Sequence, residues 1–389
     1  MCAHLVSNRK IWLCLAQARQ GDYTRFASKR HIYGHFYSTY GEQSKGLFNK
    51  LDIQVSMISS AVIIAGCPRS GTTLLYNLLS EVDDLWSLGY ESKTIIEKYH
   101  PPSAKNWVSG TLTAADLTAA SSTGMLTSFE QGAAPGTFWR EINQLRGKLN
   151  HNPLWHKIKR RGRQATPGSS VGTALPQMGL DSVRRLVLLR NRLRARSNQA
   201  ICFLEKTPEN CLRLPFLEAL FTDIRVIYLT RDGRANINSL MEGWRQPHLF
   251  PGYQVPQKVR IPGDTRGRWA FTLIPGWKQL LDHPLAEVCA RQWIACNQAV
   301  LDHRAESAGR VPYLTVKYED LITKPGEVLP ILGEFLKLPS GWGSVKKGES
   351  LPLVNAVSTP DPEKWRRNPE IARVEPLMAE MMEQLGYAK

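Results

Sequence analysis

The feature that most constrains this chain is an apolar run that leads directly into a glycine-rich turn. Residues 61–65 have the sequence AVIIA, and residues 66–75 have the sequence GCPRSGTTLL. A short run of branched side chains is typical of a buried parallel strand, and the segment after the turn predicts the start of a helix. This order presents backbone N–H groups and the positive end of a helix to an anion. The sequence therefore predicts an anion-binding loop in an α/β fold.

The loop is close to the nucleotide-triphosphate signature G-x-x-x-x-G-K-[ST], but it lacks the lysine of that signature. Gly66 and Gly71 keep the glycine spacing, whereas Thr72 stands in the lysine position and the positive charge lies at Arg69. The missing lysine disfavours a triphosphate held with magnesium. The loop instead favours an anion with less charge to neutralise, such as a phosphosulfate. Further hydrogen-bond donors are the hydroxyl groups of Ser70, Thr72 and Thr73.

Two later segments have the same strand-to-turn character. Residues 203–210, FLEKTPEN, place Lys206 after a predicted strand. Residues 225–230, RVIYLT, predict another strand, which leads into the block RDGRANINS from Arg231 to Ser239. Because Ser239 lies two helical turns beyond Arg231, both side chains are expected to face one pocket.

Together these segments resemble the sulfotransferases that use 3′-phosphoadenylyl sulfate (PAPS), and most closely the tyrosylprotein and bacterial-type branch. That branch also has PRSGTT in its loop, and an RDGR block with a serine eight residues after the first arginine. The resemblance implies an α/β, P-loop NTPase-like fold of three layers, with helices on both sides of a central, mainly parallel sheet. It implies in-line transfer of a sulfonate to a hydroxyl or amine acceptor by a glutamate base. The product would be 3′,5′-adenosine bisphosphate (PAP), and no metal would be needed.

The resemblance also implies roles for individual residues. Arg69 and Lys206 would stabilise charge on the bridging oxygen as its bond to sulfur breaks, and Arg231 with Ser239 would bind the 3′-phosphate. Tyr318 follows a predicted strand, as the family's nucleotide-contacting tyrosine does. Residues 358–367, STPDPEKWRR, resemble the late loop that closes over the nucleotide. The expected donor-binding residues are Arg69, Ser70, Gly71, Thr72, Thr73, Arg231, Ser239, Tyr318, Ser358, Lys364 and Arg366, with Arg367 as a further candidate.

Glu91 is the expected catalytic base, alongside Arg69 and Lys206 as catalytic residues. It lies in the segment GYESK, where tyrosylprotein sulfotransferases have Gly-Glu-Glu and use the second glutamate to deprotonate the acceptor. Here the glutamate falls one residue farther from the loop, and Tyr90 replaces the first acid. The alternative role for Glu91 is a favourable interaction with a helix N-terminus. His100 and His248 are the other candidate bases, because histidine serves as the base in cytosolic relatives.

Composition narrows the class of protein further. The sequence contains no run of 18 apolar residues, so it predicts no transmembrane helix. It also lacks a cluster of acidic residues or histidines that would indicate a metal site. The seven cysteines form an odd, scattered set without C-x-x-C spacing, which favours reduced thiols and a cytoplasmic protein.

The net charge of +16 is distributed unevenly. Between residues 146 and 200 there are 13 lysines and arginines and one acid, Asp181. Such a stretch either attracts anionic partners or is a solvated insert, and the sequence leaves both alternatives open. The basic stretch favours an acidic or membrane-borne acceptor. Nucleic acid is not an expected partner of the sulfotransferase.

The predicted organisation is a helical N-terminal segment, residues 1–58, and a sulfotransferase domain, residues 59–389, with a basic insertion at about residues 103–200. A long loop, residues 243–277, is expected to help form the acceptor pocket.

The alternative functions are a P-loop kinase and a protein that binds anionic surfaces or nucleic acid through residues 146–196. Further strands are expected at residues 201–204, 225–230 and 311–316, and helices at residues 93–98, 181–196, 215–221, 285–301, 326–336 and 370–385.

Overall fold

The fold is built on a six-stranded sheet with the strand order β3-β2-β4-β1-β5-β6. The structure is a computed structural model, and it describes residues 58–140, 201–246, 249–250, 252–260, 267–340, 342–343 and 363–387. Neighbouring strands are parallel, except for the antiparallel pair of β2 and β3. The strands are β1 (Ile58–Ala65), β2 (Leu85–Ser87), β3 (Ala134–Pro135), β4 (Ile201–Glu205), β5 (Ile224–Thr230) and β6 (Tyr313–Lys317).

Strand β1 lies in the middle of the sheet and is buried on both faces. Val62 is opposite Leu204 of β4 and Arg225 of β5. Because successive side chains of a strand point to opposite faces, Val62 belongs to one hydrophobic cluster and Ile63 to the other. Burial on both faces explains why this strand is a continuous apolar run in the sequence.

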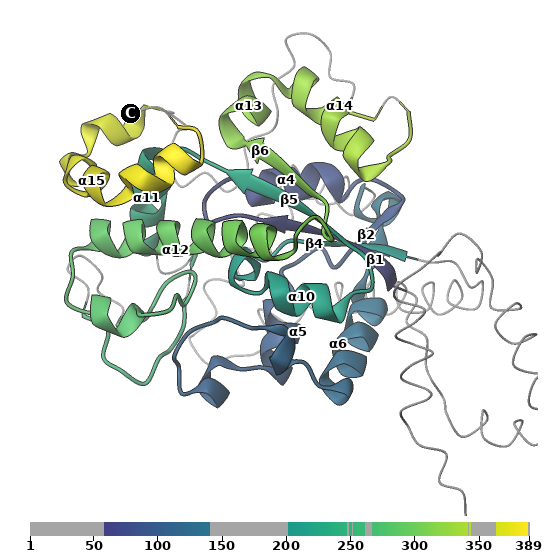
Figure 1. The fold of residues 1–389 in the computed structure, drawn as a ribbon, viewed down its shortest axis with the longest axis horizontal. Helices are drawn as coiled ribbons and strands as arrows, with labels where there is room; N and C mark the ends of the chain where they lie inside the picture. The colour runs from purple at the N-terminus through teal and green to yellow at the C-terminus, as the bar shows by residue number, and fades with distance from the viewer. Residues whose placement is uncertain are drawn as a thin grey trace, which may run out of the picture. The chain divides into compact units, whose positions relative to one another are not determined.

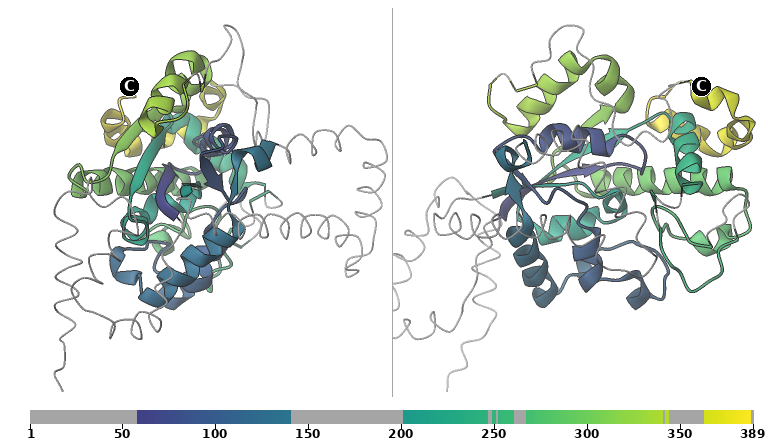
Figure 2. Two further views of the ribbon diagram at one scale, coloured as in Figure 1. Left: turned by 90° about the vertical axis from the view of Figure 1, so that its right-hand side faces the viewer. Right: turned by 180° about the vertical axis from the view of Figure 1, so that it is seen from behind.

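Helices cover both faces of the sheet (Figure 1). One hydrophobic cluster contains residues of α4, α13 and α14, and the other contains residues of α5, α6, α10, α11, α12 and α15. Both views in Figure 2 keep the pair α13–α14 and the pair α5–α6 on opposite sides of the sheet. The helices are α4 (Thr72–Leu79), α5 (Lys93–Tyr99), α6 (Ala119–Gly132), α10 (Leu214–Leu220), α11 (Gly233–Trp244), α12 (Leu285–Glu306), α13 (Tyr318–Thr323), α14 (Pro325–Leu336) and α15 (Pro369–Gln384), with short 3₁₀ helices at η3 (Pro102–Lys105), η4 (Ala114–Asp116), η5 (Pro208–Leu212), η6 (Trp277–Leu280) and η7 (Lys364–Arg367).

This arrangement confirms the predicted three-layer α/β fold with a mainly parallel sheet. The predicted N-terminal segment lies outside the described residues apart from Ile58, as do the basic stretch 146–196 and its predicted helix 181–196. Of the predicted insertion, residues 103–140 are described. They include α6, whose Met125 and Phe129 are buried in the core.

The long segment between α11 and η6 is held in place by buried tryptophans. Trp269 packs edge-on against Trp244 of α11, with ring centroids 5.5 Å apart, and lies 5.4 Å from Trp277 of η6. Gln292 of α12 donates through Nε2 to the backbone oxygens of Ala270 and Thr272, both at 2.9 Å. These contacts fix a segment whose described residues have a single isolated bridge, Tyr253 to Trp269, in place of regular strands.

The parallel strands bring four of the predicted site segments to one edge of the sheet. The glycine-rich loop follows β1, Lys206 follows β4, Arg231 follows β5 and Tyr318 follows β6. In open α/β sheets, ligands bind beyond the carboxyl ends of the strands. The edge formed by these segments is therefore where the candidate site is assembled.

Candidate active site

The glycine-rich loop turns sharply before α4. Gly71 caps the helix with a φ of 97°, and Arg69 also has a positive φ, 70°. The backbone N–H of Ser70 donates to the oxygen of Cys67 at 3.1 Å, and Asn236 of α11 donates to the oxygen of Pro68 at 3.0 Å. The loop is therefore fixed from inside and from the neighbouring helix.

The two glycines of the loop are required by close contacts. A Cβ atom at Gly66 would lie 2.6 Å from the backbone oxygen of Leu229 in β5. A Cβ atom at Gly71 would lie 2.3 Å from Cδ2 of Tyr318, where the positive φ is also unfavourable for other residues. Tyr318, predicted to contact the nucleotide, thus lies directly against the loop.

Arg69 and Arg231 bring the two arginine motifs together. Arg231 donates through Nη1 to the backbone oxygen of Arg69 at 2.7 Å, and Arg69 donates through Nε to Oγ of Ser239 at 3.2 Å. The guanidinium group of Arg231 lies over the ring of Tyr318, 4.7 Å from its centroid. Burial, and then the charge of Arg231, lowers the pKa of Arg69. Two adjacent cations in a partly buried site favour the binding of an anion.

Two buried polar atoms support an anion at this position. Oγ of Ser70 and Nε of Arg231 have no hydrogen-bond partner among the described residues. Both atoms can donate a hydrogen bond, and the N-terminus of α4 adds backbone donors. Thr72 begins α4 and is buried, whereas Thr73 is partly exposed. These donors fit the phosphate and sulfonate groups of the expected nucleotide.

Lys206 and Glu91 form an ion pair next to the loop helix. The Nζ atom of Lys206 lies 2.6 Å from Oε1 of Glu91; the lysine side chain is 6% exposed and the glutamate side chain 43%. The ammonium group also lies 5.7 Å from the ring centroid of Tyr76 in α4. Burial raises the pKa of Tyr76 to about 12, so its hydroxyl stays protonated at neutral pH. The pair therefore joins a shielded cation to a carboxylate that solvent can reach.

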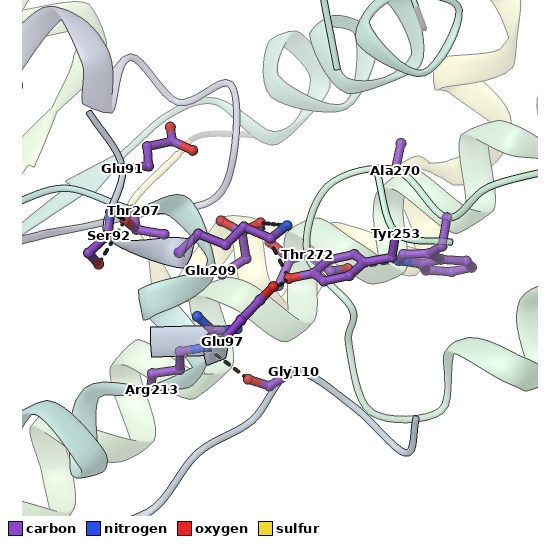
Figure 3. A network of polar contacts seen from close by, with 12 residues as sticks. Glu91, Ser92, Glu97, Gly110, Thr207, Glu209, Arg213, Tyr253, Ala270 and Thr272 are labelled. Atoms are coloured by element: carbon purple, nitrogen blue, oxygen red, sulfur yellow. Dashed lines mark hydrogen bonds and ion pairs between the residues drawn. The ribbon is translucent and has the colours of Figure 1, made fainter. Parts of the chain in front are cut away.

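A second polar network connects α5 to the long segment after α11 (Figure 3). Lys93 pairs with Glu209 at 2.6 Å and lies 3.5 Å from the ring centroid of Tyr253. The hydroxyl group of Tyr253 donates to Oε1 of Glu97 at 2.8 Å, and Arg213 pairs with the same oxygen at 2.8 Å.

Neighbouring positive charges favour the ionised form of Glu209. Burial opposes ionisation of Glu209, but the nearby charges of Lys93 and Arg213 lower its pKa overall. The sequence motifs did not identify the residues of this second network. The one feature of the sequence that points to it is the position of Glu209, three residues after Lys206.

The remaining predicted residues take part in other contacts or lie outside the described residues. Lys364 of η7 forms an ion pair with Glu242 of α11, and Arg366 pairs with Glu363 and stacks on Trp365. The ring of His100, at the end of α5, packs against Phe216 of α10 at 5.1 Å. The predicted residues outside the description are Ser358 and His248.

The long segment also reaches the donor side of the site. The ring centroid of Phe250 lies 4.9 Å from the guanidinium carbon of Arg69, and Phe250 in turn packs on Phe271 at 5.2 Å.

The ranges that the structure describes contain neither a candidate metal site nor a candidate membrane span. No group of three or more His, Cys, Asp or Glu side chains is placed there to hold a metal ion. No helix there has the length and apolar character needed to span a bilayer.

Several solved structures of sulfotransferases are similar to this chain. The chain is similar to a sulfotransferase domain from the curacin biosynthetic pathway, with 16% identity, a TM-score of 0.39, and coverage of 85% of this chain and 99% of that domain. A sulfotransferase from Mycobacterium avium has 15% identity, a TM-score of 0.40, and coverage of 89% and 82%. A sulfotransferase domain of the Synechococcus PCC 7002 olefin synthase has 18% identity, a TM-score of 0.36, and coverage of 83% and 95%. No curated protein matches the chain. The sequence model of the sulfotransferase family matches residues 61–254, which include the glycine-rich loop, Glu91, Lys206 and the Arg231–Ser239 block, and the chain belongs to this family.

Proposed function

We propose that the chain transfers a sulfonate group from PAPS to a hydroxyl or amine group of an acceptor. The observation that carries this proposal is the direct link between the two arginine motifs, from Arg231 to the backbone of Arg69 and from Arg69 to Ser239. The link brings hydrogen-bond donors of both motifs to one edge of the sheet, which supports a ligand that carries two anionic groups. A donor with a 5′-phosphosulfate and a 3′-phosphate matches that pattern.

The residues proposed to bind PAPS form two groups, one for each anionic end of the nucleotide. The backbone of the loop, the hydroxyl of Ser70 and the guanidinium of Arg69 would hold the 5′-phosphosulfate. Arg231 and Ser239 would hold the 3′-phosphate, with the ring of Tyr318 beside both Gly71 and Arg231. When bound, the donor supplies an activated sulfur–oxygen bond.

Glu91 and Lys206 would carry out the proton and charge transfers. The carboxylate of Glu91 takes the proton of the attacking hydroxyl group as the new oxygen–sulfur bond forms. The bridging oxygen keeps the electron pair of the broken bond, and the ammonium of Lys206 with the guanidinium of Arg69 stabilises that charge. In the structure Lys206 is paired with Glu91.

The test is incubation of the purified protein with sulfur-labelled PAPS and a panel of tyrosine peptides, glycans, lipids and small phenols, in the presence of EDTA. The expected result is that one acceptor class gains one SO₃ unit by mass spectrometry, with an equal amount of PAP released. A matched control is Arg245→Ala, because Arg245 forms an exposed ion pair with Glu370. Transfer should survive in Arg245→Ala and disappear in Arg69→Ala. Phosphate transfer from ATP and magnesium, without sulfonate transfer, would instead identify a kinase.

A further inference from the structure

Ser92 is hydrogen-bonded to both chain neighbours of Lys206. Its backbone N–H donates to Oγ1 of Thr207 at 2.8 Å, and its hydroxyl donates to Oε1 of Glu205 at 2.5 Å. Ser92 is itself the chain neighbour of Glu91, whose carboxylate pairs with Lys206. Figure 3 shows Ser92 and Thr207 in contact beside Glu91. The segment that carries the base is therefore attached to the turn that carries the cation.

The attachment is buried, unlike the ion pair that it flanks. Ser92 and Thr207 are fully buried, and Glu205 is 2% exposed. Asn210 donates a second hydrogen bond to Oε1 of Glu205 at 2.9 Å. Burial raises the pKa of Glu205, and the hydrogen bonds from Ser92 and Thr207 oppose that rise. Hydrogen bonds to a buried carboxyl group are costly to remove because they leave it unsatisfied.

The hydroxyl group of Ser92 is not used to cap a helix. Ser92 occupies the N-cap position of α5, where a serine side chain ordinarily accepts a backbone N–H of the first turn. Here the side chain makes no such capping bond and turns to Glu205 instead. The hydroxyl group of Ser92 therefore stabilises the contact between two segments that lie more than 100 residues apart in the chain.

We infer that Ser92 is a positioning residue that holds Glu91 in register with Lys206; the inference rests on the proposed sulfotransferase function. A partly exposed ion pair contributes little to stability and does not fix its own geometry. A displacement of about 1 Å in a catalytic group can lower the rate about 100-fold. The two bonds of Ser92 provide the rigidity that the pair lacks.

The test compares the variants Ser92→Ala, Thr207→Val and Thr207→Ser. Valine matches the shape of threonine without its hydroxyl group, whereas serine keeps the hydroxyl. We expect kcat to fall about 10- to 100-fold in Ser92→Ala and Thr207→Val, with the KM for PAPS and the affinity for PAP within about two-fold of the wild type. Thr207→Ser should recover most of the loss. Ser121→Ala is the control, because Ser121 is a similarly buried serine in the capping box of α6.

A second measurement is independent of turnover. In the wild-type protein the Lys206 ammonium group should give an ¹⁵N–¹H signal protected from solvent exchange, assigned by its loss in Lys206→Arg. Loss of that signal in Ser92→Ala, but not in Ser121→Ala, supports the inference even if no acceptor in the panel is sulfonated. An unchanged signal together with unchanged kcat in both Ser92→Ala and Thr207→Val would overturn it. Absence of PAP release by the wild type would count against the proposed function alone.

Discussion

Arg231 donates a 2.7 Å hydrogen bond to the backbone oxygen of Arg69, although the two residues are 162 positions apart in the chain. The bond joins the turn after β5 to the loop after β1, which are neighbouring strands. Arg69 continues the connection to Ser239 of α11. The arrangement makes one site from two motifs, and each end of the site can be tested separately.

Replacement of Arg69 by lysine should reduce sulfonate transfer strongly. Lysine keeps the charge but not the planar guanidinium group, whose Nε donates to Ser239. We expect kcat/KM for PAPS to fall at least about 100-fold, as for loss of a charge-stabilising donor. Steady-state kinetics with Arg245→Lys as the surface control measures the effect. Equal activity in Arg69→Lys and the wild type would show that the guanidinium has no role in transfer.

Arg231→Gln should remove the preference for a nucleotide with a 3′-phosphate. A charge-assisted hydrogen bond contributes about 1.5–3 kcal/mol, which corresponds to about 10- to 100-fold in affinity. Calorimetric titration with PAP and with AMP measures the ratio of the two affinities. The ratio should be large in the wild type and near one in the variant. Arg234→Gln is the control, because Arg234 pairs with Asp232 instead. A preference that persists in Arg231→Gln would place the 3′-phosphate elsewhere.

Glu91→Gln should lower turnover without lowering donor affinity. Glutamine has nearly the same shape but cannot take a proton, and removal of a general base costs about 100- to 10,000-fold in rate. PAP should bind with an affinity within a few-fold of the wild type. Single-turnover kinetics and PAP titration check the two parts. Normal turnover in this variant would transfer the role of base to another residue, with His100 and His248 as the sequence candidates.

Gly71→Ala should abolish donor binding, whereas Gly309→Ala should not. Both glycines have a positive φ, 97° and 80°, so each substitution carries a similar backbone cost of about 1–2 kcal/mol. Only at Gly71 would the added methyl group collide with Tyr318; nothing lies within 4 Å of the corresponding position at Gly309. PAP titration and thermal denaturation of the two variants separate the effects. Retained PAP binding in Gly71→Ala would show that Tyr318 can move freely from the loop.

His303 should make stability depend on pH. Burial lowers its pKa below the ordinary 6.5 and outweighs the opposing effect of Glu218, which its Nε2 contacts at 3.0 Å. Because the unfolded chain binds the proton more readily, the stabilisation is present above about pH 6.5 and is lost as pH falls through the folded pKa. In thermal denaturation from about pH 7.5 to about pH 5.5, His303→Gln should show a smaller fall in Tm than the wild type. Parallel curves would contradict the assignment.

The sequence predicted the elements around the glycine-rich loop because their signals are local. The apolar run before Gly66 and the glycine at position 71 are sufficient to predict strand, turn and helix, and β1 and α4 lie where expected. The helix predicted at residues 285–301 begins at the predicted residue and continues to Glu306, so only its C-terminal end differs from the prediction. Local patterns predict helices and strands well because the spacing of apolar residues along the chain follows the backbone conformation and the buried face.

Contacts between distant residues could not be read in the same way. Nothing near Lys364 in the sequence indicates that it pairs with Glu242, because that pair depends on how η7 packs against α11. The position of Tyr253 beside Glu97 likewise depends on the buried tryptophans that fix the long segment. The resemblance to a family supplied the residue types of the site, whereas the packing supplied their partners.

The most direct test of the account is a calorimetric titration of the wild-type protein with PAP in EDTA. Arg69→Ala and Arg231→Ala are titrated in parallel. We expect one PAP bound per chain in the wild type without any divalent ion, and a large loss of affinity in each variant. Absence of PAP binding by the folded wild-type protein, or equal binding by all three proteins, would contradict it.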